Sequence, residues 1–499
     1  MLYTSTRDKS VRISAAEAIT KGISADGGLF VPAEIPAVSL DFITSLCEKS
    51  YVERAVAVLK LFLEEFSEAE IRAYAEGAYL GGKFSSDAIA PLVAVNDRLN
   101  ILELWHGPTC AFKDMALQIL PYLLTGSAKK IHNDKKIIIL VATSGDTGKA
   151  ALEGFRDVDG TGILVFYPVD GVSPMQKLQM TTQQGDNVGV CAIKGNFDDA
   201  QSGVKAIFTD ADVKKVLADH GYAFSSANSI NWGRLVPQIV YYFSAYADML
   251  SLGKIKAGDA INVTVPTGNF GNILAAYYAK RMGLPVNKLI CASNANNVLT
   301  DFINTGVYDR NRQFYTTISP SMDILISSNL ERLLFMLTGE DDAKIRDLFG
   351  KLAKDGKYDV GADVAAAVKA LFAAGCCDDA ATKNTIGSLF AESHYLSDTH
   401  TAVAVSVYED YRKNTGDTTP NVIVSTANPY KFSASVLDAV TKGNYKAADE
   451  FAMVEELIAV TGVDAPAQLS SLRGKTPRFT AVCEKSEMQA EVYKMLGIH

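Results

Sequence analysis

A single lysine lies in an unusually apolar part of the sequence. Lys113 follows a Gly-Pro pair and two apolar residues, and it precedes the apolar, helix-like run 115–124. Burial disfavours the charged form of an amine, and a neutral amine is the form that makes a Schiff base with an aldehyde. The alternative is a lysine at a helix start whose stem covers apolar surface while its amine reaches water.

The segment 263–277 reads as a strand, a loop rich in glycine and asparagine, and a helix. Glycines let main-chain N–H groups approach an anion, and the positive end of the following helix favours it. The loop matches neither the Walker sequence nor the dinucleotide fingerprint. A phosphate-binding loop together with a buried amine predicts pyridoxal 5'-phosphate as the cofactor. The loop residues are Gly268, Asn269, Phe270, Gly271 and Asn272.

The run 106–114 (His-Gly-Pro-Thr-Cys-Ala-Phe-Lys-Asp) resembles the cofactor-lysine motif of threonine synthases. These enzymes belong to the tryptophan-synthase-β-like, fold type II group that uses pyridoxal phosphate. The resemblance implies that Lys113 holds the cofactor as a Schiff base and then acts as general base and general acid. It extends from residue 3 to about residue 432, and is carried by further segments at 3–7, 27–32, 143–148, 195–200, 226–234 and 268–272.

Residues 421–425 read as a strand that ends in hydroxyls. The resemblance places the Thr426 hydroxyl against the pyridine nitrogen of the cofactor, with Ser425 as the alternative. A hydroxyl does not force that nitrogen to carry a proton, whereas an aspartate does. Taken by itself, a hydroxyl in this place is also an ordinary donor at a strand-end turn.

The loop 143–148 resembles the loop that grips the α-carboxylate of the substrate in this enzyme group. Ser144, Thr147 and main-chain N–H groups would make these contacts. Many relatives carry asparagine where this chain has Asp146. A second carboxylate there would repel the substrate unless it faced away or were protonated, so Asp146 is expected in the site with its role open.

The segment 226–234 offers hydroxyl, amide and guanidinium donors. An arginine fork matches the geometry of a phosphate group. Relatives that carry out simple β-elimination need no second phosphate site, whereas a threonine synthase does, because its substrate is O-phospho-L-homoserine. The predicted substrate residues here are Asn228, Ser229, Asn231 and Arg234, and contacts by Lys177 or His106 are left open.

The resemblance implies a lyase that converts O-phospho-L-homoserine and water to L-threonine and phosphate. The reaction combines γ-elimination with β-addition of water and is the last step of threonine biosynthesis. One alternative is a β-eliminating relative such as a serine or threonine dehydratase. Another is a catalytically dead homologue that serves as a binding protein. The predicted donors at 228–234 argue against the first, and the intact Lys113 motif argues against the second.

Composition narrows the choice of partners and compartment. The net charge of −9 disfavours nucleic acid and anionic membranes as partners. Seven cysteines without a C-x-x-C pair indicate reduced thiols, and six scattered histidines predict no metal site. The polar N-terminus resembles no signal peptide, which favours the cytoplasm. We expect a monomer or a small homo-oligomer.

Short β-branched runs alternate with helical stretches from about residue 92, as in parallel α/β proteins. The predicted fold is α/β, a fold type II enzyme with parallel-rich sheets in two subdomains and a mainly helical N-terminal domain. Residues 340–390 are predicted to form helices in an insertion at the protein surface. The predicted domains are 1–90, a catalytic core at 91–435 with a smaller subdomain at about 125–230, and a C-terminal helical segment at 436–499. The predicted strands are 92–95, 99–104, 137–142, 162–167, 188–192, 260–265, 288–292 and 421–425.

Overall fold

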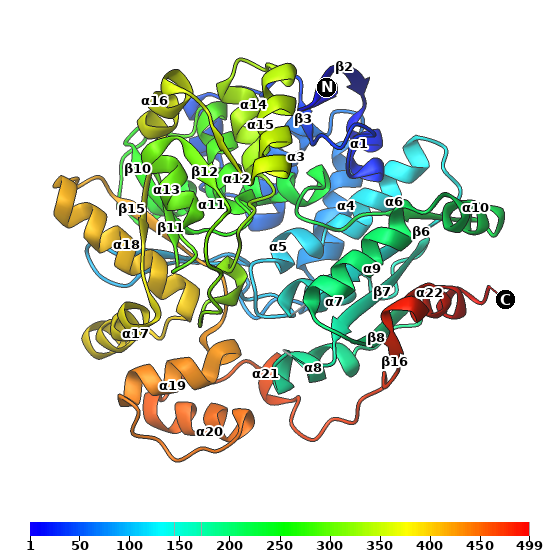
Figure 1. Cartoon of the computed structure of the whole chain (residues 1–499). Helices are drawn as coiled ribbons and strands as arrows, with labels where there is room; N and C mark the ends of the chain where they lie inside the picture. The colour runs from blue at the N-terminus through cyan, green and yellow to red at the C-terminus, as the bar shows by residue number, and fades with distance from the viewer. Residues whose placement is uncertain (144, 171, 499) are drawn as a thin grey trace.

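Two mainly parallel sheets form the framework of the computed structural model, which describes residues 1–143, 145–170 and 172–498 (Figure 1). In the larger sheet only the edge strand β4 is antiparallel to its neighbour. The order of its strands is β14 (Phe372–Cys376), β11 (Val286–Ser293), β10 (Ile261–Pro266), β15 (Asn421–Ser425), β5 (Asn100–Glu103) and β4 (Leu92–Ala94). All of the strands predicted from the sequence are present, and the predicted fold class is confirmed.

The smaller sheet is parallel throughout its described pairs. One face packs on α9, α10 and α22, and the other packs on α7. Its strands are β16 (Val482–Glu484), β8 (Val188–Lys194), β7 (Thr161–Pro168), β6 (Lys136–Ala142) and β9 (Tyr222–Ser225). Its helices are α7 (Asp146–Phe155), α8 (Pro174–Thr181), α9 (Phe197–Thr209), α10 (Ala211–Asp219) and α22 (Met488–Leu496), which follows η3 (Lys485–Glu487).

The long helix α11 (Trp232–Ser251) runs through the core and is buried along most of its length. With α12 (Gly271–Met282) it covers the face of the larger sheet that carries Val422 and Val424. The opposite face, which carries Ile423, packs on α18 (Thr399–Thr415). The remaining elements of this part are α5 (Asp114–Leu117), α6 (Leu120–Lys130), α13 (Val298–Thr305), β12 (Val307–Asp309), η1 (Pro320–Met322), α14 (Leu330–Leu337), α15 (Asp342–Asp355), β13 (Lys357–Asp359), α16 (Ala362–Leu371) and α17 (Asp379–Ser393).

The N-terminal part adds a small antiparallel sheet to the expected helices. Three of the helices begin with reciprocal capping boxes, in which a serine and a glutamate satisfy the first main-chain N–H groups. Trp232 at the start of α11 packs edge-on against Tyr3 and Phe62 and so joins this part to the core. The elements are β1 (Tyr3–Ser5), β2 (Asp8–Ile13), α1 (Ala15–Lys21), β3 (Phe30–Pro32), α2 (Leu40–Ser45), α3 (Tyr51–Phe62) and α4 (Glu68–Tyr79).

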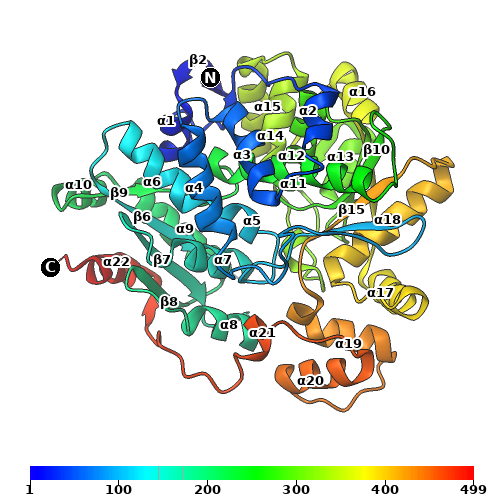
Figure 2. The ribbon, with the colours of Figure 1, turned by 180° about the vertical axis from the view of Figure 1, so that it is seen from behind.

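The C-terminal part crosses from the larger sheet to the smaller one (Figures 1 and 2). After η2 (Pro429–Phe432) the helices α19 (Ser433–Thr441), α20 (Glu450–Thr461) and α21 (Ala467–Ser470) pack together beside α17. The chain then adds β16 to the edge of β8.

Two segments that the sequence predicts to be helical also contain strands, which the prediction missed. Residues 340–390 contain β14, which pairs with β11, and residues 436–499 contain β16. Both are short edge strands, and β14 consists largely of alanine and glycine, which have little intrinsic β preference. The hydrogen bonds of the neighbouring strand therefore decide their conformation.

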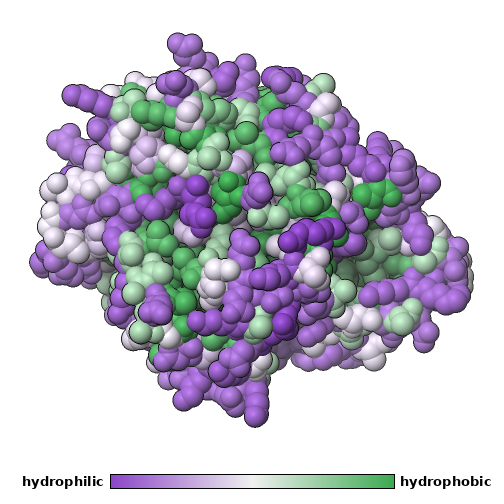
Figure 3. All heavy atoms as spheres, turned by 90° about the horizontal axis from the view of Figure 1, so that it is seen from above, coloured by the Kyte–Doolittle hydropathy of each residue, from purple (hydrophilic) through white to green (hydrophobic). Residues whose placement is uncertain are grey.

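The surface carries hydrophilic groups around scattered hydrophobic ones, as the view onto the top of Figure 1 shows (Figure 3). Among the residues that the structure describes, no helix is both long enough and apolar enough to cross a membrane.

The close packing of α5 on α7 can be tested at Gly154. A side chain at Gly154 would overlap the main-chain carbonyl of Leu117, which cannot move without shifting α5. We expect Gly154→Ala to lower the free energy of unfolding by about 1–3 kcal/mol, the usual range for overpacking, as measured by urea denaturation. Gly350→Ala is the control, because Gly350 in α15 faces open space and alanine should leave stability unchanged or raise it. Equal effects would contradict this packing.

Candidate active site

A cavity of about 350 Å³ lies between the two sheets, near the carboxyl ends of β6, β10 and β15. Most of the predicted site residues line it, although they come from distant parts of the chain. Those that line it are Lys113, Thr147, Asn228, Ser229, Arg234, Gly268, Asn269, Phe270, Gly271, Asn272 and Thr426. The structure thus brings the predicted amine, phosphate loop, hydroxyl and anion donors to one place.

Lys113 stands on a tightly fixed turn. The Thr109 main-chain N–H and hydroxyl both donate to the buried Asp114 carboxylate, at 2.8 Å each, and the Phe112 N–H donates to the Thr426 carbonyl at 2.8 Å. The Lys113 Nζ atom lies 3.3 Å from the Ser321 hydroxyl. Burial lowers the pKa of Lys113 from its usual value, as expected for an amine that must act in its neutral form.

The loop 268–272 ends in the first turn of α12, where main-chain N–H groups have no partner within the helix. Phe270 adopts a left-handed conformation with φ of 61° and starts that helix. The Asn272 Oδ1 atom accepts hydrogen bonds from Tyr241 and Tyr242, while its Nδ2 atom is buried without a partner among the described residues. This loop therefore offers an anion several N–H donors and no acid.

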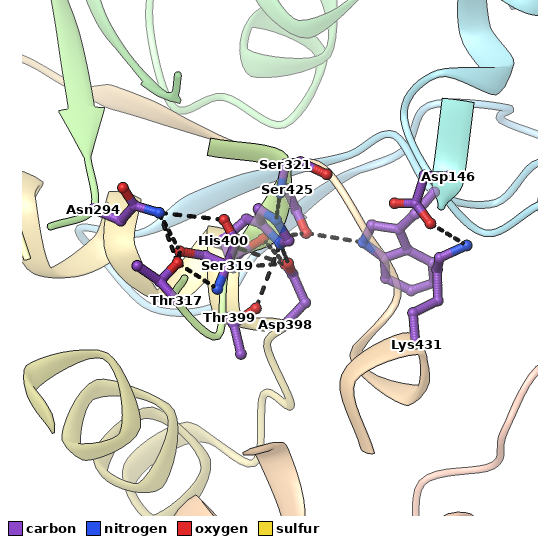
Figure 4. Close-up of polar contacts among 12 residues, drawn as sticks. Asp146, Asn294, Thr317, Ser319, Ser321, Asp398, Thr399, His400, Ser425 and Lys431 are labelled. Carbon is purple, nitrogen blue, oxygen red and sulfur yellow. Dashed lines mark hydrogen bonds and ion pairs between the residues drawn. The ribbon is translucent and has the colours of Figure 1, made fainter. Parts of the chain in front are cut away.

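The two hydroxyls at the end of β15 have different surroundings. Ser425 Oγ accepts hydrogen bonds from the Trp105 indole and the Thr401 hydroxyl, at 2.9 Å each (Figure 4). Thr426 lines the cavity instead, and its hydroxyl has no hydrogen-bond partner among the described residues. This arrangement favours Thr426 over Ser425 as the hydroxyl that faces a bound ring.

Arg234 is an almost fully buried cation, and no acid pairs with it among the residues that the structure describes. Its Nη1 atom donates to the Ala227 carbonyl at 2.8 Å, and its Nε atom has no partner within the described part of the chain. Burial lowers its pKa to about 10. Burying a guanidinium without a counter-charge raises the free energy of the folded state. Arg234 together with Asn228 and Ser229 is therefore a candidate anion-binding site.

Three of the residues considered as substrate contacts lie outside the cavity. The Asn231 side chain caps α11 and donates to the Ile19 and Ser226 carbonyls, so it is wrong as a substrate contact. His106 lies between Ser85 and Glu103, and the exposed Lys177 lies on α8; neither lines the cavity. Ser144 lies outside the described residues.

Asp146 has a partner that the sequence analysis missed. Lys431 Nζ lies 2.9 Å from Asp146 Oδ1 (Figure 4). It also donates to the Thr109 carbonyl at 2.8 Å. Burial opposes ionisation of Asp146, but Lys431 and Lys113 outweigh it and hold the pKa of this carboxyl below its usual range. A lone lysine in the otherwise uncharged run 426–433 was the available signal for Lys431.

A second missed group is a buried aspartate–histidine pair. Asp398 Oδ2 lies 2.8 Å from His400 Nδ1, and His400 Nε2 accepts the Ser321 main-chain N–H at 3.1 Å (Figure 4). His400 therefore fixes the turn that carries the Ser321 hydroxyl to Lys113, and it lines the cavity itself.

The cavity fits a cofactor that carries an aldehyde and a phosphate. A buried amine and a helix N-terminus with spare N–H groups face the same space. Asn272 also lines it, and its buried amide nitrogen has no partner among the described residues. The Arg234 guanidinium could bind a second anion in the same cavity.

Comparisons with known proteins agree with this reading of the cavity. Residues 2–79, 90–392 and 401–490 match family models described as the threonine synthase N terminus, pyridoxal-phosphate dependent enzyme and the threonine synthase C-terminal part. Human threonine synthase-like 1 is 42% identical over 85% of this chain, which spans only 58% of that relative's length. Threonine synthase from Pseudomonas aeruginosa is 40% identical over 87% of this chain and 90% of its own. The crystal structure of pyridoxal-phosphate-bound threonine synthase from Brucella melitensis superimposes with a TM-score of 0.87, at 38% identity and 99% coverage of both chains.

The ion pair between Lys431 and Asp146 should contribute measurably to stability. Lys431→Met leaves a buried carboxylate without its main partner, and we expect the free energy of unfolding to fall by about 3–5 kcal/mol. Lys431→Met combined with Asp146→Asn should lose less, because no unpaired charge remains. Urea denaturation of the native protein, of Lys431→Met, of Asp146→Asn and of the double variant measures this coupling. The exposed pair of Lys215 and Asp219 is the control, and Lys215→Met should have little effect. A double variant as unstable as the sum of both single changes would contradict the pairing.

Proposed function

Because the chain belongs to the threonine synthase family of pyridoxal-phosphate dependent enzymes, we propose that it converts O-phospho-L-homoserine and water to L-threonine and phosphate. The observation that carries this proposal is Arg234, a buried cation that has no acid partner within the described residues and lies in the same cavity as Lys113 and the loop 268–272. One anion-binding place suits the phosphate of the cofactor, and the other suits the phosphate of the substrate.

The residues that would hold the cofactor are Lys113, the loop 268–272 and Thr426. Pyridoxal phosphate, when bound, supplies an electron sink for the carbanions that form on the amino acid. The N–H groups at the start of α12 and the Asn272 amide would bind its phosphate. The Thr426 hydroxyl would face the ring nitrogen without forcing it to carry a proton.

The Lys113 amine is the described group best placed to move protons. As a neutral base it would take the proton from the α-carbon of the substrate and return a proton later. Thr147 and the N–H groups of its loop would bind the α-carboxylate. Arg234, Asn228 and Ser229 would hold the phosphate of the substrate and stabilise the charge that develops as this group leaves.

Two other functions would leave part of this cavity unexplained. A serine or threonine dehydratase acts on a substrate without a phosphate, so it has no use for the buried Arg234. A catalytically dead binding protein has no use for an amine buried beside a phosphate loop. A cytoplasmic location and a monomeric or small homo-oligomeric state remain predictions from the sequence.

The first test is the reaction itself. Incubation of the purified protein with O-phospho-L-homoserine should release phosphate and form L-threonine, identified by chromatography. Lys113→Ala should abolish both, because the cavity then has no amine to bind the cofactor or move a proton. Lys177→Ala is the control and should retain activity, since Lys177 is exposed on α8. Phosphate release with 2-oxobutanoate as the sole organic product, or no turnover at all, would overturn the proposal.

The second test separates the two anion-binding places. Arg234→Ala should reduce kcat/KM for O-phospho-L-homoserine roughly 30- to 1,000-fold, about 2–4 kcal/mol, while cofactor binding persists. Arg234→Lys should recover only part of this, because an ammonium cannot form the bidentate fork. Slow deamination of L-serine serves as the internal control, since that substrate carries no phosphate. Equal losses on both substrates would mean that Arg234 only supports the fold.

A further inference from the structure

The carboxylate of Asp146 lies between Lys431, with which it is drawn in Figure 4, and Lys113. Its Oδ1 atom is 2.9 Å from Lys431 Nζ, and its Oδ2 atom is 3.8 Å from Lys113 Nζ. The Gln176 amide also approaches Oδ1, at 3.4 Å. The proposed function gives this carboxylate no task, and the sequence analysis left its role open.

All three side chains are removed from water. The exposed fraction is 1% for the Lys431 side chain, 4% for Asp146 and 13% for Lys113. Charges interact far more strongly in such surroundings than at the surface. Asp146 is also the first residue of α7, where the helix dipole favours a negative charge. The carboxylate is therefore held ionised, with the Lys431 ammonium at one oxygen and the Lys113 amine nearest the other.

Ionised groups approach Lys113 from several elements. Lys431 in η2 and Arg234 in α11 disfavour an ammonium at Lys113, and burial acts in the same direction. Asp146 in α7 opposes them, with a weaker contribution from Asp114 in α5. Asp114 is occupied by the Thr109 donors. His400 from α18 lines the same cavity, but its Nε2 atom accepts the Ser321 main-chain N–H, so it contributes no positive charge there.

These surroundings pose a specific problem for the proposed reaction. A lysine that accepts a proton must hold an ammonium for a time, yet two buried cations disfavour that ammonium. An ionised carboxylate at 3.8 Å offsets them. A substrate carboxylate would gain nothing from Asp146, whose charge has the same sign.

We propose that Asp146 is a positioning residue that acts through Lys113: its fixed negative charge keeps the buried amine basic enough to accept a proton from the substrate. Lys431 holds the carboxylate ionised in that place. The inference rests on the proposed role of Lys113 and assigns Asp146 to the amine rather than to the carboxylate of the substrate.

The experiment measures the basicity of Lys113 directly. The full-length protein, freed of pyridoxal phosphate, is labelled with trace acetic anhydride across a pH series, and labelling of the Lys113 peptide is quantified by mass spectrometry. Asp146→Asn should lower the midpoint of this profile by about 1–3 pH units, the usual effect of an adjacent opposite charge. Asp146→Glu keeps the charge and should stay closer to the native midpoint. Asp219→Asn removes an exposed carboxylate and is the matched control without a shift.

A second variant covers the case in which Asp146→Asn fails to fold because Lys431 is left unpaired. The double variant Lys431→Met with Asp146→Asn removes both charges. Its midpoint should still lie below the native one, since Asp146 acts on Lys113 more strongly than Lys431 does. An unchanged or raised midpoint in whichever of these variants folds overturns the inference. Labelling requires no turnover, so this outcome is independent of whether the protein forms threonine.

Discussion

The burial of one lysine amine is the constraint on which the rest of this structure depends. Lys113 has to reach the space between the two sheets with its amine shielded from water. The turn before it is fixed by Thr109 and Asp114, and the bond from Phe112 to Thr426 joins that turn to the end of β15. The helices α5 and α7 then approach so closely that only glycine fits at position 154. Each of these features serves to hold the amine in place.

The buried cations around this amine are satisfied in different ways. Arg332 donates to the Phe30 and Ile230 carbonyls and to the Asn329 side chain, so its charge is dispersed over neutral acceptors. Lys431 has a carboxylate partner. Arg234 has one carbonyl and, among the described residues, no partner for its Nε atom. This contrast supports the proposal that Arg234 binds an anionic ligand, because the protein itself compensates the other two cations.

The N-terminal part supports the region that carries these anion donors. Arg332 ties the Phe30 carbonyl to that of Ile230, and Asn231 donates to the Ile19 carbonyl from the start of α11. Trp232 then packs against Tyr3 and Phe62. The segment 226–234 is thereby held between the N-terminal part and the core, and Arg234 donates to the Ala227 carbonyl within that segment.

The sequence by itself determined the parts of the site that lie on one short segment each. The surroundings of Lys113 and the loop 268–272 depend on neighbouring residues and on a strand-to-helix turn, so their chemistry could be inferred from the local sequence. The role of Thr426 at the end of β15 came from the family resemblance. The alternating pattern likewise predicted the central strands. Only the tertiary structure decided that Asn231 caps a helix, that β14 and β16 are strands, and that Lys431 and His400 enter the site. These outcomes rest on contacts between residues far apart in the chain, such as Lys431 with Asp146 and His400 with Ser321. The amino-acid sequence does not show which buried charges lie in contact, because these contacts depend on how the two sheets and the C-terminal segment pack together.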